Sequence, residues 1–159
     1  MSSKSNFGIA PVPTITVQNR TSNNFYFQSY ESVNNTGKEI SKITVDNYKD
    51  GKLNISTSPF TISIWQNNNN KSKPALRITS DDIINQAISD IDSKSKLIDG
   101  INGINGMTLV ICALPINAYY RGATCNKEKL WYYYKVNGNF STPYQKGPNY
   151  NGSSFDITC

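Results

Sequence analysis

The chain has 159 residues, 37% of them hydrophobic and 17% charged, and its formal net charge is +5. This length fits one domain with a core of its own, and the abundance of Asn, Ser, Thr, Gly and Tyr favours strands and turns over long helices. The positive charge rests mainly on lysine, and three arginines are few for the forked phosphate and guanine contacts of a nucleic-acid binder. We therefore expect an all-β domain that binds no nucleic acid.

The complete absence of histidine removes the commonest general base and the usual zinc ligand. No carboxylate lies in an apolar setting that would raise its pKa, and no motif supports a serine or cysteine nucleophile. The segment from Asp90 resembles a calcium loop for three letters, but Lys94 stands where a ligand oxygen is required. We expect a protein that is not an enzyme and that needs no metal or cofactor.

Residues 1–13 are predicted to form an extended arm, because their two prolines disfavour helix and sheet alike. Residues 14–159 then form the single domain. The arm carries apolar side chains that cannot fold by themselves, so they either dock on their own domain or reach another subunit. We expect the arm to link subunits of a homo-oligomer. It also lacks the apolar stretch of a secretory signal, which predicts cytoplasmic synthesis, with any release by a non-classical route.

The next strands are predicted from apolar residues that alternate with polar ones. Asp50-Gly51 is expected to form a hairpin turn between two of these strands. The alternation is cleanest at 60–65, which predicts one buried face and one wet face, with Trp65 on the wet face or at the strand end. The residues expected to face inward are Ile15, Val17, Phe25, Phe27, Ile43, Val45, Leu53, Ile55, Phe60, Ile62, Ile64, Leu76 and Ile78.

One amphipathic helix is predicted at about 80–97, where isoleucines and Ala87 recur at helical spacing. Ser80 is the expected N-cap, because two acidic residues follow it in the first turn. The opposite face is polar, so the helix should lie on a sheet and not inside it. The Gly-rich segment 100–106 is interpreted as a flexible connection, because no strand leads into it and no phosphate-loop lysine follows.

The run from Met107 to Ile116 is the most apolar part of the chain, and Thr108 is its only polar residue before Pro115. It is too short to cross a bilayer as a helix, which takes about 20 apolar residues. Its β-branched residues and its glycine and proline boundaries predict a central strand buried on both faces. Cys112, within this run, should be a buried thiol, whereas the more polar Cys125 and Cys159 are candidates for a disulfide.

The last third of the chain is rich in tyrosine. Residues 130–136 are predicted to form a strand, turned by Asn137-Gly138, and a final strand is expected around Phe155 and Ile157. Trp131 and Tyr133 should share one face of the tyrosine strand, and Tyr132 and Tyr134 the other. Because one buried face cannot use four aromatics, a ligand site is predicted here and in the flanking loops. The expected ligand-binding residues are Tyr119, Tyr120, Trp131, Tyr132, Tyr134, Tyr144 and Tyr150.

Together these patterns predict a single β-sandwich or jelly-roll-like domain of about eight to ten short strands with one amphipathic helix. At the level of fold this resembles small lectins and membrane-binding β-sandwich proteins. The expected function is that of a non-enzymatic binding module of the defence or toxin type, lectin-like or membrane-surface-binding, with a glycan or a lipid headgroup as ligand. The alternative is a structural self-assembling protein, such as a filament, coat or inclusion-body subunit.

Overall fold

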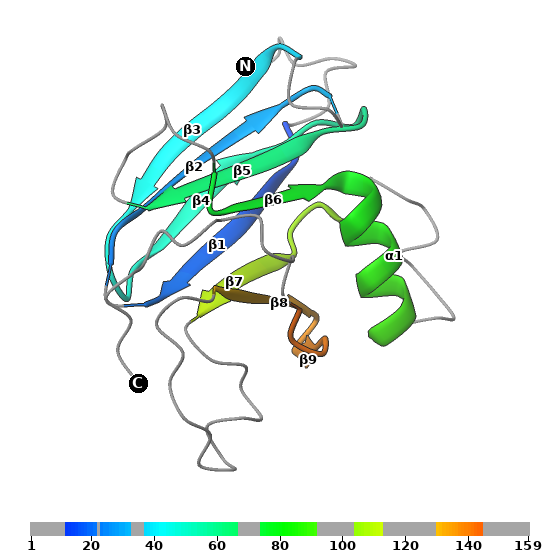
Figure 1. The fold of residues 1–159 in the computed structure, drawn as a ribbon. Helices are drawn as coiled ribbons and strands as arrows, with labels where there is room; N and C mark the ends of the chain where they lie inside the picture. Colours follow the sequence, from blue (N-terminus) through cyan, green and yellow to red (C-terminus); the bar gives the residue numbers. More distant parts are fainter. Residues whose placement is uncertain are drawn as a thin grey trace, which may run out of the picture.

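A computed structural model describes residues 12–21, 23–32, 37–66, 74–91, 104–112 and 130–144, which form two β-sheets and one α-helix (Figure 1). The spatial order of the five-stranded sheet is β4 (Asp50–Asn54), β1 (Thr14–Arg20), β7 (Thr108–Cys112), β8 (Trp131–Val136) and β9 (Asn139–Phe140). That of the four-stranded sheet is β3 (Glu39–Val45), β2 (Phe25–Tyr30), β5 (Thr61–Gln66) and β6 (Leu76–Thr79). The predicted all-β sandwich with a single helix, α1 (Ser80–Asp90), is confirmed.

A continuous hydrophobic core joins the two sheets, because alternate side chains of each strand point into the space between them. Ile15 and Val17 of β1 are fully buried, and so are Phe25 and Phe27 of β2. Ile43 of β3 is only partly buried but packs against the same core. The residues predicted to face inward therefore do so in each of the first six strands and in the segment that leads into β5.

The apolar run predicted as a central strand is β7, the middle strand of the five-stranded sheet. Leu109 and Ile111 face the core between the sheets, and Val110 and Cys112 are buried on the opposite face. Burial on both faces is thus confirmed. β7 runs parallel to β1 and antiparallel to β8, so it joins the N-terminal and C-terminal parts of the described chain in one sheet.

The predicted wet face of residues 60–65 is wrong. Thr61 and Ser63 of β5 are fully buried, and Trp65 is only 5% exposed. The Thr61 hydroxyl donates to the carbonyl of Ser32, and the Trp65 ring lies 5.7 Å from that of Tyr26 on β2, between centroids. β5 is an inner strand between β2 and β6, so neighbours on both sides limit the exposure of its short polar side chains.

The predicted N-cap of α1 is also wrong by one residue. Thr79 is the N-cap: its hydroxyl accepts from the amide of Asp82 at 3.0 Å, and the Asp82 carboxylate accepts from the amide of Thr79 at 3.0 Å. This reciprocal pair is a capping box. Ser80 instead binds the start of β5, where its hydroxyl accepts from the amide of Phe60. The helix ends at Asp90 with Ile91 as C-cap.

The helix packs against the side of the sandwich, next to β6, from which it directly continues (Figure 1). Ile83 and Ala87 are fully buried in the core, and Ile84 and Ile91 pack against it. The predicted amphipathic role is therefore confirmed for the described part of the helix. Residues 92–97 of the predicted helix lie outside the described residues.

The two predicted hairpin turns have different outcomes. Asn137 and Gly138 both have positive φ, 50° and 82°, as a tight turn between β8 and β9 requires, so this prediction is confirmed. Asp50-Gly51 is not a turn but the start of β4; the chain turns just before it, where Tyr48 has φ 60°. A Cβ on Gly51 would lie 3.0 Å from side-chain atoms of Ile43 and Val45, so this glycine permits β3 and β4 to approach closely.

The last residues of the Gly-rich segment are fixed to the domain rather than forming a flexible connection. Ile104 is fully buried in the core. The amide of Gly106 donates to the carbonyl of Thr14 at 2.8 Å, and the amide of Thr14 donates to the Asn105 side chain at 2.9 Å. These contacts place the start of β7 beside β1.

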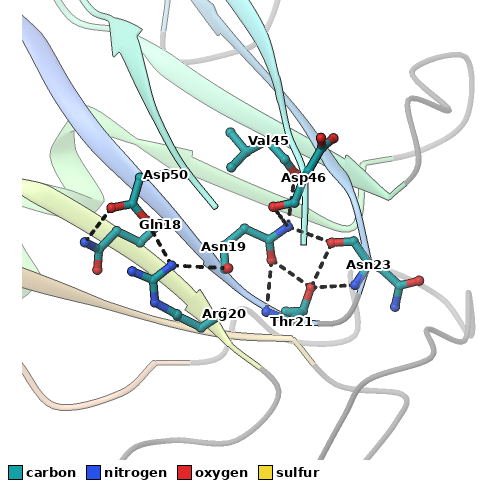
Figure 2. A network of polar contacts seen from close by, with 8 residues as sticks. All are labelled: Gln18, Asn19, Arg20, Thr21, Asn23, Val45, Asp46 and Asp50. Atoms are coloured by element: carbon teal, nitrogen blue, oxygen red, sulfur yellow. Dashed lines mark hydrogen bonds and ion pairs between the residues drawn. The ribbon is translucent and has the colours of Figure 1, made fainter. Parts of the chain in front are cut away.

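A buried asparagine organises the opposite end of β1 (Figure 2). The Asn19 amide donates to the carbonyls of Asn23, Val45 and Asp46 at 2.6, 3.0 and 3.2 Å. Its carbonyl oxygen accepts from both the amide and the hydroxyl of Thr21. The side chain therefore ties the β1–β2 turn to the β3–β4 turn, and its own polar groups are all satisfied.

The same network continues to the outside of the sheet through Arg20 (Figure 2). Its guanidinium pairs with Asp50 of β4 at 2.9 Å, and Gln18 donates to the other oxygen of that carboxylate at 3.3 Å. This arginine is therefore engaged within its own sheet.

Two predicted features lie outside the described residues. They are most of the N-terminal arm and the final strand around Phe155 and Ile157. Val12 and Pro13 are the part of the arm that the structure describes, and the Pro13 carbonyl accepts from the amide of Ile55 at 2.8 Å. Within the described ranges, no helix has the length and apolar character needed to cross a membrane.

Candidate binding site

The tyrosine strand β8 lies between β7 and β9, and its two faces meet different surroundings. Tyr132 and Tyr134 point into the core between the sheets and are fully buried. Trp131 and Tyr133 point to the outer face, where Trp131 remains half-buried. The predicted pairing of the four aromatics is thus confirmed, and the pair on the outer face is Trp131 with Tyr133.

Three tyrosines converge on one residue of the helix, Gln86. Its side-chain amide donates to the Tyr132 hydroxyl at 3.0 Å, and its side-chain oxygen accepts from the Tyr134 hydroxyl at 2.6 Å. The Tyr144 hydroxyl donates to the Gln86 backbone carbonyl at 3.2 Å. The three ring centroids lie 5.7 to 6.0 Å from one another. We call these three tyrosines with Gln86 the tyrosine–glutamine cluster; it fastens α1 to the five-stranded sheet.

The buried hydroxyls of this cluster are held in their neutral form. Burial raises the pKa of Tyr132 to about 12 and that of Tyr134 well above its usual value of 10. Both groups are therefore protonated at neutral pH, where they donate hydrogen bonds. Since their rings lie in the core, Tyr132 and Tyr134 offer no free ring face for stacking on a ligand.

The outer face of the sheet carries a second aromatic group. Tyr133 packs with Val110 and Cys112 of β7 and with Trp131, and its ring lies 5.9 Å from that of Phe140. Phe140, on β9, is 54% exposed. We call Trp131, Tyr133 and Phe140 the outer aromatic patch.

A cation lies directly on this patch. The Lys135 ammonium nitrogen stands 5.6 Å from the centre of the Phe140 ring, within the range of a cation–π contact. Lys135 and Phe140 are paired in register across the β8–β9 hairpin. An exposed ring, a half-buried indole and an ammonium group therefore share one face.

Cys112, beneath this patch, has the predicted burial. It is 4% exposed, and burial raises the pKa of its thiol to about 12. At neutral pH the sulfur is a thiol rather than a nucleophilic thiolate.

The remaining predicted site residues lie outside the described residues, so their contribution stays a prediction. This holds for three of the seven predicted ligand-binding residues and for the proposed disulfide pair. They are Tyr119, Tyr120 and Tyr150, and Cys125 and Cys159.

The outer face of the four-stranded sheet carries aromatic and charged residues that were not among the predicted site residues. Tyr26 and Tyr30 of β2, Trp65 of β5 and Arg77 of β6 all lie on the side opposite the core. The signal was present, because in β2 both tyrosines alternate with the buried phenylalanines.

Arg77 on this face differs from Arg20 on the other sheet. The Arg77 Nε is shielded from solvent and has no hydrogen-bond partner. Among the described residues, the only ion pair is that of Arg20 with Asp50. A buried donor without an acceptor costs free energy, so this position is polar but unsatisfied by the described protein groups.

No cluster of three or more histidine, cysteine, aspartate or glutamate side chains that could hold a metal ion occurs within the described part of the chain. No protein-family model, no curated protein and no solved structure matches this chain.

Proposed function

We propose that the protein is a non-enzymatic binding module, lectin-like or membrane-surface-binding, whose ligand contacts the outer aromatic patch. The observation that carries the proposal is the exposed Phe140 ring under the Lys135 ammonium, on the same face of the sheet as Trp131 and Tyr133. Aromatic rings and an ammonium group on one surface suit the apolar face of a sugar or the boundary of a lipid headgroup. The glycan and the headgroup are separate arms of the test.

The shifted pKa values assign Cys112 and Tyr132 to packing rather than to a role as nucleophile or base. Burial moves the Cys112 thiol and the Tyr132 hydroxyl toward their neutral forms at physiological pH. A catalytic nucleophile or base needs the opposite shift, toward a form that can attack or accept a proton near neutral pH. These two groups therefore act in packing and hydrogen bonding.

The test compares the unmodified protein with a Trp131→Ala/Phe140→Ala double variant on a glycan array and on liposomes of zwitterionic or anionic lipid. Loss of an aromatic anchor typically costs about 2 kcal/mol, or about 30-fold in affinity. The control is Tyr48→Ala, because Tyr48 is 49% exposed but lies at the β3–β4 turn. Absence of binding by the unmodified protein, or equal loss in the control, would contradict the proposal.

The alternative function is self-assembly, and one observation favours it. β3 is an edge strand of seven residues in the four-stranded sheet, and such an edge can accept a strand from another copy. The predicted N-terminal arm would supply that strand. Light scattering on the full chain and on a chain lacking residues 1–13 should then show a larger assembly for the full chain. Two equal, monomeric masses would refute it.

A further inference from the structure

The outer face of β2, β5 and β6 has an ordered layout. One cross-strand row runs Lys42, Gln28, Ser63 and Arg77, in that order across β3, β2, β5 and β6. Ser63, the shortest side chain of the row, lies between the glutamine and the arginine. The tyrosines of β2 lie on either side of Gln28 along the strand. We call Gln28, Ser63 and Arg77, with Tyr26, Tyr30 and Trp65, the Arg77 face; Lys42 lies outside it on the edge strand β3.

This side of the sheet carries two cations, Lys42 on the edge strand β3 and Arg77 on β6, and Arg77 is the one with a guanidinium. Glu39, the acidic residue at the edge, accepts from the Gln28 amide at 2.7 Å. Arg77 takes no part in the one ion pair of the described residues, and its Nε has no acceptor. The Nε and one terminal nitrogen of a guanidinium form a fork that matches a carboxylate. Because Nε is shielded in this conformation, binding through that edge requires a rotation of the side chain.

Two tyrosines and a tryptophan share this face of the sheet with Arg77. Tyr30 lies within electrostatic reach of both Glu39 and Arg77: burial, Tyr26 and the Glu39 carboxylate raise the pKa of Tyr30, and the Arg77 charge opposes that shift. The Tyr30 hydroxyl is thus a neutral donor near the guanidinium. Tyr26, whose ring leans against Trp65, is half-buried and adds a second partly exposed ring. Rings, hydroxyls and a carboxylate-matching fork on one face suit a sugar ring that bears an acid group.

We propose that the Arg77 face is a second binding site, one that takes a sugar carrying a carboxylate, with Arg77 as the anion contact and Tyr26 and Tyr30 against the ring. The site lies on the other sheet from the outer aromatic patch. It goes beyond the proposed function and does not depend on it: either surface can bind when the other fails.

The experiment is a nuclear magnetic resonance titration of the full chain, observing the Arg77 Nε–H signal and the tyrosine rings. The probes are D-glucuronate, neutral D-glucose and inorganic sulfate. Glucuronate should shift the Arg77, Tyr26 and Tyr30 signals, and glucose and sulfate should bind at least about tenfold more weakly, because each lacks half of the recognised chemistry. Signals of Trp131 and Phe140 should stay unchanged.

Two variants distinguish recognition by the two-pronged guanidinium of Arg77 from attraction to any positive charge. Arg77→Lys keeps the charge and the aliphatic stem, and should weaken glucuronate binding by about tenfold, since an ammonium cannot form two parallel bonds. Lys42→Gln removes a charge from the same row and should change affinity by less than about threefold, because exposed charges are well screened. No shift at Arg77, equal binding of sulfate, or equal loss in both variants would overturn the proposal.

Discussion

The inward and outward faces of β8 carry the same kinds of side chain and yet have opposite roles. Tyr132 and Tyr134 are fully buried and hydrogen-bonded to Gln86 on the helix, so they hold the sandwich together. On the opposite face, Trp131 stays half-buried, and Phe140 of the neighbouring strand β9 is exposed. The comparison teaches that tyrosine content does not locate a binding surface: what matters is which rings find a partner inside the protein.

The largest expected effect on stability comes from removing the two aromatic rings on the inward face of β8. A Tyr132→Ala/Tyr134→Ala variant loses two large buried rings, each of which is worth about 3–5 kcal/mol. Since whole domains are stable by only about 5–15 kcal/mol, this variant should be largely unfolded at room temperature. Near-ultraviolet circular dichroism and urea titration check this. A variant that folds normally would show that these rings are not core.

Alkaline pH should lower the free energy of unfolding through the same two tyrosines, without any substitution. In the unfolded chain tyrosine ionises near pH 10, whereas in the folded chain burial raises the pKa of Tyr132 to about 12 and that of Tyr134 well above 10. The unfolded state therefore releases protons first, and stability, complete below pH 10, falls as the pH rises toward 12. Each group contributes about 1.4 kcal/mol per pH unit.

Urea titrations at about pH 8 to pH 11 measure this slope, and a Tyr132→Phe/Tyr134→Phe variant is the control, since it keeps the rings but cannot ionise. Its stability should decline less steeply than that of the unmodified protein. Identical slopes would assign the decline to other groups.

A smaller effect is expected from the helix side of the cluster. Gln86→Ala removes the partner of two tyrosine hydroxyls and should cost about 1–3 kcal/mol in free energy of unfolding. Asn85→Ala is the matched control, because Asn85 is the preceding amide of the same helix and is exposed. Thermal unfolding of both variants gives the difference; if both lose equally, the cluster does not hold the helix.

The smallest effect on stability is expected on the outward face. Phe140 is more than half exposed, so Phe140→Ala should change the free energy of unfolding by no more than about 0.5 kcal/mol. The same substitution should weaken ligand binding if the outer aromatic patch is the site. A large loss of stability would instead make Phe140 a structural residue and blur the contrast between the two faces.

The sequence by itself determined the local elements, because their causes are local. Alternation placed Ile15, Val17, Phe25 and Phe27 in the core, and the continuous apolar run identified β7 as a strand buried on both faces. The Asn137-Gly138 turn was predictable as well, since few residues adopt positive φ readily. Each of these features depends on a few neighbouring residues and on backbone geometry.

Only the tertiary structure decided which face of a strand is covered. A period of two groups Tyr132 with Tyr134, but the inward choice depends on Gln86, 46 residues away from Tyr132. The buried polar face of β5 likewise depends on that strand lying between β2 and β6. Gly51, which looks like a turn residue in sequence, serves close packing against β3 instead. Burial is a property of what packs on a face, and a local pattern carries no information about the distant segment that supplies the cover.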